Sequence, residues 1–390
     1  MLANRGGALV SQLAVGAFLS PETVGIWAVA LAITTISLFF QANDFSRIPL
    51  QGTCPEEVIA IDETLNRWLM VSWIIVASLI AILMPSFAGK SYAPLLALLA
   101  LCPLRIQASR FVTRLSTSGN MKRISWCTAA EGLVRTLVLV SALFLGAGLW
   151  SFVLVEWAAV TTQLIMVWPE SNNQIPKKST LWRLPSPIIT KICTTSLVCL
   201  LVASEGHVVS ILLAKAASES AAGSYFFSLR FANQINMILY PLMILESLPT
   251  LIKNRTDPSR FTSEVRRLLR RYWILALTMG TVIAVIGPIG LRVVWGNRWM
   301  EAANMLHILG FSMAIRAMYV FAKVQLEAVG SFNLILALSV FDLTMISSIL
   351  IVAGLNHFSP IMIVGILGLE SLLILICAQI LARRNHPLAG

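Results

Sequence analysis

Charged side chains interrupt several long apolar runs of this 390-residue sequence, and they are the residues whose types could do chemistry. A charge at the centre of a lipid bilayer costs about 2.5–3.5 kcal/mol on insertion scales, so each such group needs a partner, a polar cavity or a function. The arginines are Arg5, Arg105, Arg135, Arg230 and Arg316, and the other ionisable residues are Glu131, Glu156, Glu205, His207, Asp342 and Glu370.

Arg230 is the strongest candidate for binding an anionic substrate. A guanidinium group suits phosphate because its planar fork donates two parallel hydrogen bonds. Arg230 follows Gly223 by seven residues, which places it about 10 Å below the outer end of a helix that begins at that turn. At this depth the side chain does not easily snorkel to the surface. We therefore expect Arg230 to bind phosphate, with a structural ion pair as the alternative.

Other charges have spacings that predict ion pairs. Glu131 and Arg135 lie one helical turn apart, and we expect them to neutralise each other. An offset of 211 residues pairs Arg105 with Arg316 and Glu131 with Asp342. This shared offset predicts an interhelical Arg–carboxylate pair in each half of the chain, and substrate contact by Arg105 and Arg316 is the alternative.

Glu205 and His207 are candidates for carrying a coupling proton, His207 because the ordinary pKa of its imidazole is about 6.5. Two residues apart on a helix, they point roughly 200° apart and do not form one site. A packing role is the alternative for His207.

The composition places these charges in a membrane protein. The chain is 57% hydrophobic and 12% charged, far less charge than a soluble surface of this size needs. Its apolar runs are about 20 residues long, enough to cross a hydrocarbon core of about 30 Å as helices. We attribute the net charge of +11 to asymmetric loops rather than to nucleic-acid binding.

The apolar pattern predicts an all-α integral membrane fold with twelve transmembrane helices. A polar segment rich in Pro, Ser and Lys, residues 169–188, separates six spans from six. The predicted organisation is therefore an N-terminal lobe (1–168), a cytoplasmic linker (169–188) and a C-terminal lobe (189–390). The spans are 2–19, 23–43, 65–86, 91–113, 124–146, 149–168, 189–213, 221–249, 271–295, 300–326, 332–354 and 358–382.

Basic residues set the predicted orientation. With both termini in the cytoplasm, most of the 29 lysines and arginines lie on the cytoplasmic side, as the positive-inside rule requires. This topology also places Trp27, Trp150, Trp295 and Trp299 at the outer membrane interface.

Two similar stretches mark the beginning of each half. An offset of 198 residues pairs Ser20 with Ser218 and Trp27 with Tyr225, and the offset of 211 also pairs Gly119 with Gly330. Six spans in each half would insert in the same orientation, which predicts two parallel six-helix repeats.

Three stretches resemble Wzx-type polysaccharide exporters, which flip lipid-linked oligosaccharides and belong to the multidrug/oligosaccharidyl-lipid/polysaccharide superfamily. They are "LSPETVGIWAVALAI" (19–33), the helix between Arg105 and Arg123 with "STSGNMKRI" (116–124), and "FLGAGLWSFVL" (144–154). The resemblance covers nearly the whole chain. It implies V-shaped lobes around a cationic central cavity that is lined by the first two helices of each half.

The resemblance places Arg5, Glu205, His207 and Arg230 around that cavity. It implies a flippase that moves undecaprenyl-pyrophosphate-linked oligosaccharide across the bacterial inner membrane by alternating access, for surface polysaccharides such as lipopolysaccharide. The implied partners are this substrate, membrane lipids, a polysaccharide polymerase and other glycan-assembly proteins. A drug/cation antiporter and a non-transporting scaffold of a glycan-assembly complex are the alternatives.

We expect no enzymatic activity and no cofactor. The triplet Gly89-Lys90-Ser91 lacks the upstream glycine of a phosphate-binding loop, because position 84 is Met84. The sequence also has no spacing typical of a metal site. An ion gradient, a substrate gradient or a partner must therefore supply the energy for transport.

Overall fold

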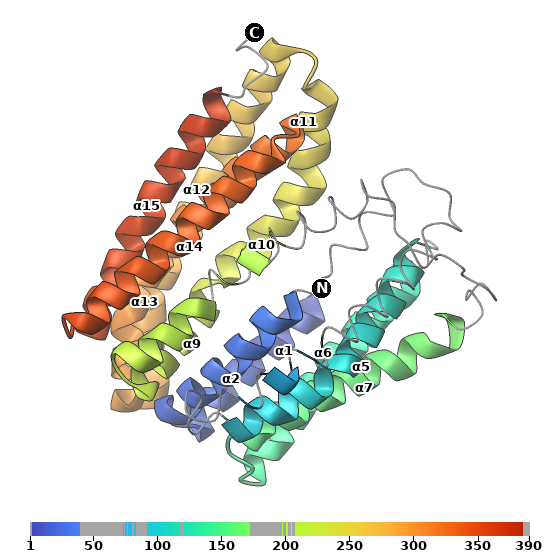
Figure 1. Cartoon of the computed structure of the whole chain (residues 1–390), viewed down its shortest axis with the longest axis vertical. Helices are drawn as coiled ribbons and strands as arrows, with labels where there is room; N and C mark the ends of the chain where they lie inside the picture. The colour runs from blue at the N-terminus through green and yellow to red at the C-terminus, as the bar shows by residue number, and fades with distance from the viewer. Residues whose placement is uncertain are drawn as a thin grey trace. The chain divides into compact units, whose positions relative to one another are not determined.

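The computed structural model describes residues 2–39, 73, 75, 77–79, 82, 92–117, 121–171, 197, 200–201, 204 and 207–384. These residues form helices and short connecting turns, with no strand among them (Figure 1). The all-α expectation is thus confirmed for the part of the chain that the structure describes, whereas the number of twelve spans stays a prediction.

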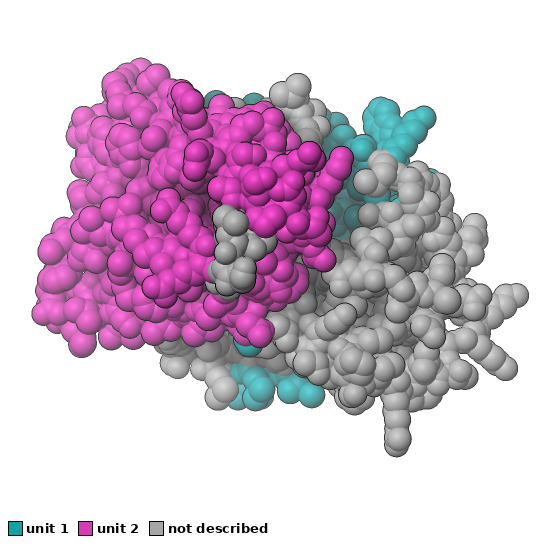
Figure 2. Space-filling view, turned by 90° about the horizontal axis from the view of Figure 1, so that it is seen from above, with its two compact units in different colours: residues 1–207 teal, residues 208–390 magenta. Residues whose placement is uncertain are grey.

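The chain forms two compact units, residues 1–207 and 208–390, which Figure 2 colours separately. The labelled helices of the first unit are α1 (Leu2–Phe18), α2 (Pro21–Phe39), α5 (Tyr92–Thr117), α6 (Met121–Phe144) and α7 (Trp150–Ser171). Those of the second unit are α9 (Glu219–Ala232), α10 (Gln234–Leu242), α11 (Leu248–Asn254), α12 (Pro258–Trp295), α13 (Met300–Val329), α14 (Phe332–Leu355) and α15 (Pro360–Arg384).

Five helical stretches of the described residues have the length and apolar composition needed to cross a membrane. The longest contains both α12 and α13, which a short 3-10 turn, Gly296–Trp299, connects. The others are Lys122–Phe144, Trp150–Val167, Phe332–Leu355 and Pro360–Arg384. Most of the predicted linker 169–188 lies outside the described residues.

The two similar stretches each begin a helix. The Ser20 hydroxyl accepts a hydrogen bond from the backbone N–H of Thr23 (3.3 Å) at the start of α2. Ser218 accepts one from the N–H of Ala221 (3.0 Å) at the start of α9. Serine is favoured at this position because its oxygen satisfies a backbone donor that has no partner within the helix. The repeated sequence therefore marks a helix N-terminus.

Two glycines shape the turn between α6 and α7. Gly146 has a φ of 77° and Gly148 a φ of 54°, a backbone region that glycine enters without the steric cost of a Cβ atom. The stretch "FLGAGLW" thus works as a tight connection that brings α7 back along α6.

The predicted span 221–249 is interrupted in the structure. α9 and α10 meet at Asn233, and a π-helical turn, Met243–Ser247, follows α10. Pro241 lies in the last turn of α10 and has no backbone N–H to donate to the preceding turn. A proline in this position is a common cause of such an irregular segment.

The helices α12 and α13 cross at small residues. A Cβ atom on Gly310 would lie 2.8 Å from the carbonyl oxygen of Gly280 and 2.9 Å from the Cβ of Ala284. A Cβ atom on Gly280 would lie 2.9 Å from that of Ala314. Small residues four positions apart on each helix let the two backbones approach closely, as in many membrane helix pairs.

Two of the tryptophans expected at the outer membrane interface are buried inside their units, while their depth in the membrane stays a prediction. Trp27 and Trp299 are 1% and 0% exposed. Trp27 stacks on Phe152 and Trp299 stacks on Phe227. Aromatic stacking on a neighbouring helix therefore helps to fix both rings.

Candidate functional site

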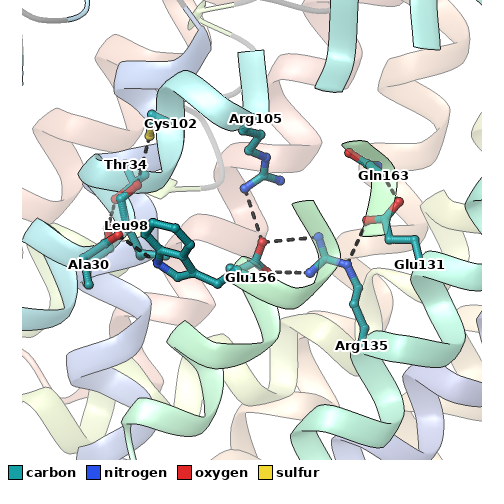
Figure 3. A network of polar contacts seen from close by, with 11 residues as sticks. Ala30, Thr34, Leu98, Cys102, Arg105, Glu131, Arg135, Glu156 and Gln163 are labelled. Atoms are coloured by element: carbon teal, nitrogen blue, oxygen red, sulfur yellow. Dashed lines mark hydrogen bonds and ion pairs between the residues drawn. The ribbon is translucent and has the colours of Figure 1, made fainter. Parts of the chain in front are cut away.

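A network of ion pairs joins three helices of the first unit (Figure 3). Arg135 on α6 donates to Glu156 on α7 through Nη1 (2.6 Å) and Nη2 (3.2 Å), and its Nε donates to Glu131 (2.9 Å). Arg105 on α5 reaches the same Glu156 at 3.4 Å. Gln163 on α7 donates to Glu131. Two cations and two carboxylates therefore balance each other in this network.

A smaller and more deeply buried cluster lies in the second unit. Arg316 on α13 donates through Nη2 to Asp342 on α14 (3.2 Å) and to Glu370 on α15 (3.1 Å). Its Nε donates to the hydroxyl of Ser371 (3.1 Å). The side chains of Arg316, Asp342 and Glu370 are 17%, 0% and 1% exposed. The cluster ties three helices together in the interior of the unit.

These contacts confirm two of the predicted pairs and correct a third. Glu131 and Arg135 form the expected pair within α6, and Arg316 forms the expected pair with Asp342. The expected pair of Arg105 with Glu131 is wrong in its acid, because the structure pairs Arg105 with Glu156. Glu131 is already bonded to Arg135 on its own helix and to a side chain of α7.

The predicted ion pairs include neither Glu156 nor Glu370, although each of these acids completes one of the two networks. The available signal was that each is the single acid in its predicted span, 149–168 or 358–382. An acid in such a position implies a cation on a neighbouring helix.

Arg230 lies in the last turn of α9 and is exposed in its unit. Its guanidinium carbon lies 4.7 Å from the centre of the Phe226 ring, one turn earlier, in a cation–π contact. Because α9 begins after Ser218 and not at Gly223, Arg230 is twelve residues from the cap. This corresponds to about 18 Å along the helix axis rather than the expected 10 Å. Arg230 is thus farther from the helix start than the sequence suggested.

Of the remaining candidate site residues, the structure describes only some side chains. Arg5 belongs to α1, but its side chain lies outside the described residues, as does Glu205. His207 begins the helix His207–Ala216 and is half-buried. Within the described ranges, no group of three or more His, Cys, Asp and Glu residues has the arrangement of a metal site.

Solved structures share this fold at low sequence identity. An inward-facing multidrug resistance transporter of the MATE family superposes with a TM-score of 0.71 at 12% identity, over 96% of this chain and 94% of its own. The lipid II flippase MurJ in an inward closed conformation gives 0.72 at 11%, over 98% and 87%. A MOP superfamily transporter from Pyrococcus furiosus gives 0.56 at 15%, over 100% and 92%.

The apolar helices and this shared architecture define a multi-pass membrane protein with the fold of MOP-superfamily transporters. A family model described as polysaccharide biosynthesis protein matches residues 15–304, and the chain belongs to that family. A search of curated proteins finds no match.

Proposed function

We propose that this protein is a flippase that moves a lipid-linked oligosaccharide across the bacterial inner membrane for surface polysaccharide synthesis. The observation that carries the proposal is the match to the polysaccharide biosynthesis family over residues 15–304. The fold supports it, because a lipid II flippase is among the structures that share it. Undecaprenyl pyrophosphate is the proposed lipid carrier, and alternating access of the two lobes is the proposed mechanism.

The proposed substrate contact is Arg230. Its side chain is exposed on α9, and the cation–π contact with Phe226 orients its permanent positive charge. A guanidinium group can bind a pyrophosphate through two parallel hydrogen-bond donors. Arg5 is proposed as a second contact by resemblance. For Arg105 and Arg316, the ion pairs described above favour the packing role over the substrate role.

A drug/cation antiporter is the second candidate, because MATE transporters share the fold. Arg230 argues against it, since an exposed permanent cation repels the cationic substrates of such an antiporter. The proposed topology has both termini in the cytoplasm, with the linker 169–188 on the same side. A polysaccharide polymerase and other glycan-assembly proteins are the proposed partners.

The test is translocation in lipid vesicles that contain the purified full chain. A fluorescent undecaprenyl-pyrophosphate oligosaccharide is placed in both leaflets, and a membrane-impermeant reductant then bleaches the outer leaflet. We expect the protected fraction to fall from about half towards zero only in vesicles that contain the protein. A protected fraction equal to that of protein-free vesicles would contradict the proposal, and uptake of a fluorescent drug cation would favour the antiporter.

A further inference from the structure

The buried cluster of the second unit has an unusual ratio of charges. One guanidinium nitrogen, Nη2 of Arg316, serves both Asp342 and Glu370. In the network of the first unit, two arginines face two carboxylates. Burying a carboxylate that is not neutralised is expensive, so the cluster around Arg316 requires further positive charge if both acids are ionised.

The two acids are held close to each other by this shared donor. The nitrogen Nη2 of Arg316 lies 3.2 Å from Oδ1 of Asp342 and 3.1 Å from Oε2 of Glu370. The second oxygen of Glu370, Oε1, is shielded from solvent and has no hydrogen-bond donor among the residues that the structure describes. Ionised carboxylates carry only acceptors, so two of them can bond each other only when one holds a proton.

The surrounding groups are compatible with a proton in this position. Ser371 on α15 donates its hydroxyl to the backbone oxygen of Leu367 (2.9 Å). Tyr225 on α9 is a buried phenol of the same unit. The next cation along α13, Lys323, lies seven residues from Arg316, about 10 Å along the helix, and bonds Ser339 on α14 (3.0 Å).

We propose that Asp342 and Glu370 form a binding site for one proton, which the two carboxyl groups share while Arg316 neutralises the remaining negative charge. A metal ion fits less well, because Arg316 already bonds one oxygen of each acid and a hard cation needs about six oxygen ligands. The proposal is independent of the transported substrate. Water that reached the cluster in another conformation would allow the proton to leave, which makes the site a candidate for coupling to a proton gradient.

Infrared spectroscopy of the full-length protein in lipid vesicles tests this assignment. The wild type near neutral pH is expected to show the carbonyl stretch of a protonated carboxylic acid, with the small downshift in heavy water that an exchangeable proton gives. Glu370→Gln should remove this band, because the amide can donate to Asp342 and replace the proton. Asp342→Asn should remove it in the same way, which provides a second variant if one is poorly folded.

The matched control is Glu156→Gln in the first unit, where the charges balance without a proton. This variant should keep the band. Persistence of the full band in both Glu370→Gln and Asp342→Asn would overturn the proposal. Loss of the wild-type band on addition of sodium ions would also overturn it, because a metal ion would then occupy the place assigned to the proton. None of these readouts depends on whether the protein transports an oligosaccharide.

Discussion

Arg105 and Arg316 correspond at the 211-residue offset, yet their surroundings differ. Arg316 is 17% exposed and bonds two acids that are almost completely buried. Arg105 is 40% exposed and lies 3.4 Å from Glu156, an acid that also forms an ion pair with Arg135. Substituting a charged residue costs most stability where its partners are buried away from water, because those partners are then left uncompensated. The two arginines should therefore contribute unequally to stability.

We therefore predict that Arg316→Ala destabilises the protein strongly and Arg105→Ala only weakly. Loss of Arg316 leaves buried acids without their cation, at a cost of about 3–5 kcal/mol, whereas an exposed ion pair contributes about 0–1 kcal/mol. Thermal unfolding of the purified variants in the same detergent measures the difference. Equal melting temperatures for the two variants would contradict this ranking.

Arg230 should behave differently from both. If it binds the pyrophosphate, Arg230→Ala should abolish glycan export while the amount of protein in the membrane stays near normal. Arg230→Lys should restore export only in part, because an ammonium keeps the charge but loses the bidentate fork. Surface glycan and membrane-inserted protein are measured in the same cells.

The control for Arg230 is a neighbouring exposed position on the next helix, Met237→Ala, which removes no charge. Normal export from well-expressed Arg230→Ala would refute the anchoring role. Disappearance of that variant from the membrane would instead indicate a structural ion pair.

At the residue scale, the sequence identified the charged groups but not all their partners. The i,i+4 geometry of Glu131 and Arg135 follows from helical spacing alone. Arg105 pairs with Glu156 because of the way α5, α6 and α7 pack. The spacing of residues along one helix contains no information on the packing between helices. Arg230 lies farther from the helix start than its spacing from Gly223 predicts, because Ser218 caps α9 five residues before that glycine.

At the scale of helices, the crossing of α12 and α13 depends on the absence of side chains. We predict that Gly310→Ala destabilises the protein, because its new Cβ would lie 2.8 Å from backbone atoms of α12. Overpacking of this kind costs about 1–3 kcal/mol. Thermal unfolding of the purified protein checks the effect.

Gly290→Ala is the matched control, since a Cβ at this position of α12 meets no described atom within 4 Å. It should be neutral or stabilising by up to about 1 kcal/mol, because alanine favours a helix over glycine. A Gly310→Ala variant as stable as Gly290→Ala would show that the two helices can separate without cost.

The start of α12 provides a pH-dependent contribution. The carboxylate of Asp257 accepts hydrogen bonds from the hydroxyl of Ser259 (2.7 Å) and from the N–H of Arg260 (3.1 Å). The Ser259 hydroxyl is the main cause, and the Arg260 N–H the next, of a pKa of Asp257 below its ordinary value of 3.8. Folding lowers the pKa of Asp257, so its carboxylate stabilises the folded protein at pH values above the ordinary pKa. This stabilisation is lost as the pH falls through the lower pKa of the folded state.

We therefore predict that Asp257→Ala lowers the melting temperature at neutral pH and that the difference from wild type shrinks in strong acid. Asp257→Asn keeps an acceptor at the helix start but does not titrate, so its own contribution should not change with pH. A constant difference between wild type and Asp257→Ala over the whole acid range would contradict the assignment.

The lengths of the apolar runs predicted most of the described helices well. They failed to predict the helix ends where polar residues continue a helix beyond its apolar run. The predicted span at 271–295 is part of a helix that begins at Pro258, because the intervening arginines form helix readily but carry no apolar signal. The break between α10 and α11 was likewise hidden, since every residue of the π-helical turn except Glu246 and Ser247 is apolar.

At the scale of the whole molecule, the orientation in the membrane is the next quantity to measure. Reporter domains fused after Lys178 and after Asn297 should be active on opposite sides, with the first in the cytoplasm and the second outside. The positive-inside rule is the physical reason. A cytoplasmic signal at Asn297, or an external one at Lys178, would contradict the proposed topology.

The membrane class could be predicted from the sequence because hydrophobicity acts over whole helices and needs no knowledge of contacts. The family resemblance was also visible, through "LSPET" and "FLGAGLW", and both stretches proved to be helix starts and turns. The glycan is beyond sequence reasoning, because sugar specificity depends on the shape of a cavity that no short motif records.

The length of α12 has a consequence for the surface of the protein. Its 38 residues extend about 57 Å. Even tilted by about 40°, it would cover about 44 Å of membrane depth, more than the roughly 30 Å of hydrocarbon. Its arginine-rich beginning and the turn Arg255–Asp257 that precedes it are therefore expected outside the hydrocarbon core, in the polar headgroup region or in water. An antibody or a protease directed at this turn should reach it in intact vesicles of one orientation and fail in the other.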